Sequence, residues 1–182
     1  REAIKSLEIT GAVHSTPGVG IVIQEFNTDF FLSNLIYSIS DEDQLHKEIE
    51  ELRRVLELGF AKDAFDHMTG KGIALLSEKV ETMEELFNQI KRSRSSIYGV
   101  KFAEADAAFH KILFQDVDNH LLKSIIEFFW ACDRYYKVKT THSNMELTVE
   151  KHRRICNALK AGSYPDFYDA VQFHFNVGYF KR

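Results

Sequence analysis

Hydrophobic residues recur with the period of an α-helix over most of the chain. From residue 41 onward, apolar side chains are spaced three and four positions apart, which is the pattern of helices that bury one face. The predicted helices cover residues 41–67, 77–95, 100–114, 120–137, 147–161 and 166–180. We therefore expect an all-α fold, an antiparallel bundle of six to seven helices.

The first residues follow a different pattern. Residues 1–9 have the spacing of a helix end, and two β-prone runs follow at residues 12–15 and 21–24. Gly18 and Gly20 lie between these runs, as is typical of a hairpin turn. A unit this small does not fold alone. The predicted organisation is a helix–hairpin remnant in residues 1–25, a linker in residues 26–40 with a helix at 29–39, and a helical domain in residues 41–182.

Composition and charge narrow the class of protein. With 182 residues, 45% of them hydrophobic, the chain can bury a sizeable core. The net charge of −4 argues against a chain that is basic throughout and binds nucleic acid along its length. Two cysteines, Cys132 and Cys156, are too few for a disulfide framework, so we expect a reduced, cytoplasmic setting. The apolar runs are too short to span a membrane. Because the first residue is Arg1, we expect the chain to begin inside a longer protein.

Polar residues interrupt the apolar stripes of three predicted helices. Asp106 and His110 lie one turn apart on the inward stripe of residues 100–114. His152 and His174 interrupt the stripes of the last two helices. A buried polar group is costly unless a partner satisfies it. Four such groups on three helices suggest one shared partner, and a metal ion would serve all of them.

Each residue also has a simpler interpretation. Asp106 and His110 could form an ion pair on a helix surface. His152 or His174 could be a core histidine bonded to a backbone carbonyl. Their coincidence on inward stripes favours a ligand set of three nitrogens and one oxygen, which suits Zn²⁺ or Ni²⁺, and also Co²⁺ or Fe²⁺. The remaining histidines are expected to be solvated: His14, His46, His67, His120 and His142.

A cation lies on the stripe of the long predicted helix. Arg53 shares this stripe with Ile49, Leu52, Leu56 and Phe60. The simpler interpretation is an ion pair with Glu57, four residues later. The functional interpretation is a guanidinium that faces the metal site, where its planar fork would bind a carboxylate. A metal and an arginine together predict a pocket for a small organic acid.

The motifs of the chain resemble those of a known family. The opening "REAIKSLEITGAVHSTPGVGIVI" resembles the end of the winged helix-turn-helix of GntR-type bacterial regulators, where the recognition helix closes and a wing follows. The rest resembles the helical effector domain of the FadR subgroup, in its metal-binding branch. The matching blocks are "ELRRVLE", "DAAFH", "DNHLL" and "EKHRRICNALKAGSYPDFYDAVQFHF". Together they cover essentially the whole chain.

The resemblance assigns roles to individual residues. It implies that Asp106, His110, His152 and His174 are metal ligands and that Arg53 faces the effector. It also implies that the remnant of the DNA-binding domain contacts DNA through Arg1, Lys5, Gly18 and Gly20. Two departures stand out. Val19 lies where the family usually has arginine, and "GSYPD" replaces a shorter "GD", so we expect a longer loop before the last helix.

The favoured function is a transcriptional regulator that responds to a metabolite. It would be a homodimer that binds operator DNA through an N-terminal domain that is mostly missing here, with no enzymatic activity and no membrane association. One alternative is a mononuclear helical metalloenzyme, but the sequence offers no general base near the ion. Another is a helical scaffold whose histidines are only buried.

Overall fold

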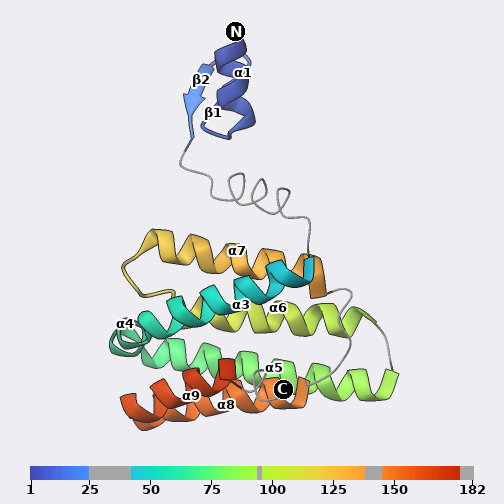
Figure 1. Cartoon of the computed structure of the whole chain (residues 1–182), viewed down its shortest axis with the longest axis vertical. Coiled ribbons are helices and arrows are strands. Elements are labelled where there is room, and N and C mark those ends of the chain that lie inside the picture. The colour runs from blue at the N-terminus through green and yellow to red at the C-terminus, as the bar shows by residue number, and fades with distance from the viewer. Residues whose placement is uncertain (25–41, 94–95, 138–144, 177–182) are drawn as a thin grey trace. The chain divides into compact units, whose positions relative to one another are not determined.

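The computed structural model describes residues 1–24, 42–93, 96–137 and 145–176 (Figure 1). The chain divides into two compact units, Arg1–Glu42 and Asp43–Arg182. The predicted linker helix at residues 29–39 and the domain boundaries at residues 25 and 40 lie outside or at the edge of the described residues. Within the described ranges, no helix is both long enough and apolar enough to cross a membrane.

The first unit is a helix followed by a hairpin. Helix α1 (Glu2–Ile9) precedes strands β1 (Val13–Thr16) and β2 (Gly20–Ile23), which pair antiparallel with Val13 opposite Ile23. Gly18 and Gly20 have φ of 80° and 105°, a region that favours glycine, so the turn depends on both. The predicted helix–hairpin is confirmed. None of residues 1–24 is buried, so this unit has no core of its own among its described residues.

The second unit is a helical bundle, which confirms the predicted all-α fold. Helix α5 packs against α6 and α8, α6 packs against α7, and α9 packs against α8 and α4 (Figure 1). The described helices of this unit are α3 (Glu42–Gly59), α4 (Ala61–His67), α5 (Gly70–Ser93), α6 (Ser96–Leu113), α7 (His120–Lys137), α8 (Met145–Ala161) and α9 (Tyr164–Asn176).

The core follows the predicted stripes on α6 and α8. Every residue of the α6 stripe is buried: Phe102, Ala105, Asp106, Phe109, His110 and Leu113. The same holds for the α8 stripe: Val149, His152, Ile155, Cys156 and Leu159. Removal of this apolar surface from water is the main force that holds the helices together. It also carries the polar members of each stripe into the interior.

The single helix predicted for residues 41–67 is wrong, because the structure breaks it at Phe60. Gly59 ends α3, and Phe60 leaves helical geometry with φ −98° and ψ 8°. Glycine is a poor helix former, which makes this position a favourable place for a break. The break lets α4 pack against α9, where the Phe65 ring lies 5.5 Å from the ring of Phe167. Tertiary packing therefore overrides the continuous helical pattern.

Two predicted loops are also wrong. Helix α5 begins at Gly70 instead of residue 77, because the Thr69 hydroxyl accepts a hydrogen bond from the backbone N–H of Gly72 at 3.0 Å and caps the helix. The expected long loop in "GSYPD" is absent, since α9 begins at Tyr164. Gly162, with φ 65°, ends α8, and the Ser163 N–H donates to the Ala158 carbonyl at 3.2 Å.

The tight turn between α8 and α9 matters for the site. His152 lies ten residues before Gly162, and His174 lies twelve residues after it. Because the two helices leave the turn side by side, these residues return to about the same level of the bundle. A longer loop would fix the relative level of His152 and His174 less firmly.

Candidate metal centre

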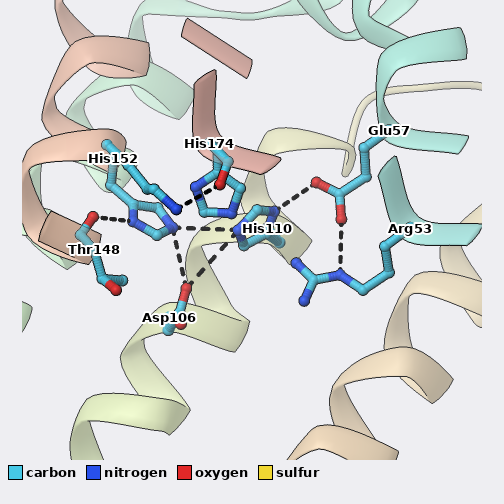
Figure 2. A network of polar contacts seen from close by, with 8 residues as sticks. Arg53, Glu57, Asp106, His110, Thr148, His152 and His174 are labelled. Carbon is cyan, nitrogen blue, oxygen red and sulfur yellow. Dashed lines mark hydrogen bonds and ion pairs between the residues drawn. The ribbon is translucent and has the colours of Figure 1, made fainter. Parts of the chain in front are cut away.

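The four predicted ligands come together at one point inside the bundle. Asp106 and His110 extend from α6, His152 from α8 and His174 from α9 (Figure 2). The ligating atoms of the three histidines lie within 4.8 Å of one another. His110 and His152 are 1% and 0% exposed, Asp106 is buried, and His174 is partly buried. This group of side chains could hold a metal ion.

Three atoms face one another at the centre of the group. His152 Nε2 lies 3.2 Å from His110 Nε2 and 3.0 Å from Asp106 Oδ1. Asp106 Oδ1 is 3.8 Å from His110 Nε2. The His174 ring completes the group, with its centroid 4.8 Å from that of His110 and 4.7 Å from that of His152.

The hydrogen-bond partners of Nδ1 in His110 and His152 determine which nitrogen of each ring carries the proton. His110 Nδ1 is 2.7 Å from Glu57 Oε2, and His152 Nδ1 is 2.7 Å from the Thr148 carbonyl oxygen. A carboxylate and a carbonyl can only accept, so each Nδ1 must donate. In the neutral imidazole the other nitrogen, Nε2, then carries a lone pair. The simpler interpretation of His152, a carbonyl-bonded core histidine, is thus part of what prepares it as a ligand.

The facing lone pairs fit a shared cation. Two Nε2 lone pairs and a carboxylate oxygen repel one another unless a positive charge lies between them. A proton can bridge only two of these atoms, whereas a metal ion can bind all of them. Donors bound to one ion at about 2.1 Å lie about 3.0 Å apart at right angles and about 3.4 Å apart at tetrahedral angles. The observed 3.0 and 3.2 Å agree with these spacings, and the third separation, 3.8 Å between Asp106 Oδ1 and His110 Nε2, is somewhat longer.

His174 is suited to complete the set. Its Nδ1 is buried and has no hydrogen-bond partner among the described residues. Burial lowers the pKa of His174 well below its ordinary value, and the neighbouring His152 and His110 lower it further. The ring is therefore neutral near pH 7, with a nitrogen available to a ligand. Lys151 helps to fix α9 here, since its Nζ donates to the His174 carbonyl at 2.7 Å.

Glu57 belongs to the site, although the sequence indicated only that it could pair with Arg53. It is 1% exposed and connects Arg53 Nε, at 3.2 Å from its Oε1, with His110. Burial alone would raise the pKa of Glu57, but His110 and Arg53 hold it below its ordinary value. Burial also lowers the pKa of His110, against the opposing effect of Glu57. An ionised carboxylate behind a neutral histidine is a common support for a metal ligand.

The buried face of α3 differs from the predicted one. Leu52, placed on the inward stripe from the sequence, is 54% exposed. Ile49, Arg53 and Glu57 are the buried residues instead, and they share one face at intervals of four. The helix is rotated so that an ion pair, rather than leucine, points inward. The spacing of Arg53 and Glu57 was the available signal.

One buried nitrogen of Arg53 has no hydrogen-bond partner among the described residues. Its Nε donates to Glu57, and its guanidinium carbon lies 4.0 Å from the Trp130 ring centroid and 5.8 Å from that of Phe175. Its Nη2 is buried and makes no hydrogen bond within the described part of the chain. An unpaired buried donor costs about 1–3 kcal/mol, more when it is charged. The arginine is thus both the predicted partner of Glu57 and a free donor near His110 (Figure 2).

The residues predicted to contact DNA lie on the first unit. Arg1 and Lys5 are exposed on or beside α1, and Lys5 Nζ is 3.9 Å from Glu2 Oε1. Gly18 and Gly20 form the hairpin turn. Their role stays a prediction. His14, His67 and His120 are exposed, whereas the side chains of His46 and His142 lie outside the described residues.

Known proteins share this architecture. The chain is 24% identical to the HTH-type transcriptional regulator LutR of Bacillus subtilis, over all of this chain and 85% of that protein. It is also 24% identical to the HTH-type transcriptional regulator YcbG of the same species, where the match spans 87% of this chain and 62% of that protein. Among solved structures, Streptococcus agalactiae GntR superposes with a TM-score of 0.69 at 21% identity, over 96% of this chain and 77% of that one.

A family match covers the region that contains the site. Residues 48–177 match the FCD domain, which is more than half of the chain and includes all four candidate ligands. The resemblance found in the sequence motifs is thereby confirmed for the family and for its all-helical effector domain. The chain belongs to the FCD domain family.

Proposed function

We propose that the helical domain binds one divalent transition metal ion, Zn²⁺ or Ni²⁺, through Asp106, His110, His152 and His174. The observation that carries this proposal is the convergence of two Nε2 atoms and a carboxylate oxygen, which lie 3.0–3.8 Å from one another. A bound ion would supply a positive charge that these acceptors otherwise lack, and that attracts carboxylate oxygens. Glu57 and the Thr148 carbonyl hold the two rings in the tautomer that a metal requires.

The proposed effector is a small carboxylic acid that reaches both the ion and Arg53. The free Nη2 of Arg53 supports this, because a charged donor in a buried setting favours an anionic acceptor. The stacked Trp130 ring restricts the guanidinium to one plane, which lowers the entropy lost when the carboxylate binds. Metal and arginine would then fix the acid at two points.

Effector binding would regulate transcription through operator DNA. The relatives are named HTH-type transcriptional regulators, and the hairpin unit has the form of a wing. In this proposal the protein is a cytoplasmic homodimer without catalytic activity. Arg1, Lys5, Gly18 and Gly20 lie in the DNA-contacting part, and the acid changes the affinity for the operator. Such coupling between sites typically amounts to about 1–3 kcal/mol.

Calorimetry on protein with and without metal tests this function. The protein is treated with a chelator, dialysed, and titrated with 2-hydroxybutanoate before and after one equivalent of ZnCl₂ or NiCl₂ is restored. We expect heat of binding only from the metal-loaded protein. Equal binding to the stripped protein would contradict a metal-held effector, and no binding to either form would contradict the carboxylate class for this probe.

A further inference from the structure

The charged side chains around the site limit how much negative charge a ligand can bring. Among the described residues, the ionised side chains that contact one another or a candidate ligand side chain are Arg53, Glu57 and Asp106, while the partly buried Lys151 binds the backbone carbonyl of His174. Glu57 and Arg53 are 1% and 6% exposed and cancel each other at 3.2 Å. Asp106 cancels one of the two charges of the proposed ion. One positive charge remains, so a ligand with a single negative charge leaves the buried site neutral.

A second negative charge on the ligand would enter a buried site whose cations already have partners. An ion taken out of water costs several kcal/mol unless it is paired and hydrogen-bonded. Within the described part of the bundle, two cations lie beside the candidate ligands. Glu57 already uses the Nε of Arg53, and Lys151 Nζ donates to the His174 carbonyl at 2.7 Å. Trp130 and Phe175 lie near the guanidinium at 4.0 and 5.8 Å. The unpaired Nη2 is therefore the buried donor that remains for a carboxylate.

We infer that Glu57 determines specificity, because it makes the site select monocarboxylates over dicarboxylates. This inference rests on the proposed function and adds the ligand's charge class to it. Glu57 acts twice, through its charge and through its hold on Arg53 Nε. Without that carboxylate, the site would carry one more positive charge and the guanidinium could offer a second donor to a second carboxylate.

Two acids of equal length test the selectivity. 2-Hydroxybutanoate and 2-hydroxybutanedioate share four carbons and the same hydroxy-carboxylate group, and differ by one negative charge at pH 7.5. Calorimetry on zinc-loaded protein should give a Kd at least about tenfold lower for the monoanion, which corresponds to about 1.4 kcal/mol. Equal or tighter binding of the dianion overturns the inference but leaves the proposed function intact. If neither acid binds, the proposed function itself fails for this class.

Replacing the charged Glu57 by a neutral residue distinguishes a role in ligand specificity from a role in supporting His110. In Glu57→Gln the preference for the monoanion should fall about tenfold or more, as expected if one buried charge is removed. Zinc content, measured by elemental analysis, is the accompanying readout. The matched control is Glu84→Gln, since Glu84 is half-exposed, pairs with Arg153 on the bundle surface and carries the same charge. This control should keep the wild-type preference.

Several outcomes would count against Glu57. If Glu57→Gln loads zinc fully but weakens both acids by the same factor, Glu57 only supports His110 and the inference is overturned. If the variant does not load zinc, Glu57 is needed to support His110 as a ligand, and the assignment of specificity to Glu57 is overturned. A change in preference in Glu84→Gln as large as that in Glu57→Gln would assign the effect to overall charge and would also overturn it.

Discussion

The buried face of α5 is apolar, whereas the buried region where α6, α8 and α9 meet contains polar and charged side chains. The buried residues of α5 are Gly72, Leu76, Val80, Met83 and Ile90, all without a polar side chain. In contrast, α6 and α8 bury Asp106, His110 and His152 on the same stripes as their apolar residues. Both regions are shielded from water, but only the first is stabilised by burial alone. In the proposed function, a metal ion supplies positive charge to the second region.

The largest loss of stability should come from a substitution in the apolar face of α5, and this loss should be independent of metal. Leu76 is fully buried, so Leu76→Ala removes apolar contacts and leaves a cavity. The free energy of unfolding should fall by about 2–5 kcal/mol. Urea unfolding, followed by circular dichroism, measures this with and without chelator. A loss that appears only in the metal-loaded protein would show that the two regions are not separable in this way.

The second largest effect is a loss of the stability that bound metal provides. His152→Ala removes a fully buried proposed ligand, so the stabilisation by added Zn²⁺ should disappear. At a free metal concentration about 100 times the Kd, that stabilisation is about 2.7 kcal/mol in the wild type. The difference in Tm between zinc-loaded and chelated samples reports it. His120→Ala is the control, since His120 is exposed at the start of α7. Equal Tm differences in both variants would reject His152 as a ligand.

A smaller effect should leave the metal in place. Arg53→Lys keeps the charge but replaces the planar fork with a single ammonium group. Because a hydrogen bond to a charged group contributes about 1.5–3 kcal/mol, the affinity for 2-hydroxybutanoate should fall about tenfold or more. Titration calorimetry with zinc content measured in parallel is the test. Unchanged affinity would leave Arg53 as a structural partner of Glu57 only.

The smallest effect concerns a thiol on the apolar side of α8. Burial raises the pKa of Cys156 to about 11, against smaller opposing effects of Ser77 and Lys160. A rise of about two units from an ordinary thiol lowers the reactive thiolate fraction about a hundredfold at pH 8. Iodoacetamide labelling, read by peptide mass spectrometry, should therefore modify Cys156 slowly until urea unfolds the protein. Rapid labelling in the native state would show that this stripe is open to solvent.

The sequence correctly predicted which side chains are buried where a helix has one clearly apolar face. The stripes of α6 and α8 follow directly from spacings of three and four, and they carried His110 and His152 to the right place. The hairpin followed from its glycines. The same reasoning failed for Leu52, because a stripe that mixes apolar and charged residues does not fix the rotation of α3.

Features that depend on contacts between distant segments could not be predicted from the sequence. The break at Phe60 is stabilised by packing of α4 against α9, far along the chain. The end of α8 at residue 161 agrees with the predicted helix, but the length of the following turn was wrong, because α9 already begins at Tyr164. The support of His110 by Glu57 joins residues 53 positions apart, so only the assembled bundle brings it out. Periodicity indicates which side chains face inward, but not which of them meet.

The most direct test of the central claim is a crystal structure of protein purified without chelator, with anomalous data collected on both sides of the zinc and nickel absorption edges. The account predicts one anomalous peak per chain, about 2.0–2.2 Å from a ligating atom of each of Asp106, His110, His152 and His174. If ordered side chains show no peak, even after crystals are soaked in ZnCl₂ or NiCl₂, the metal centre proposed for this bundle would be contradicted.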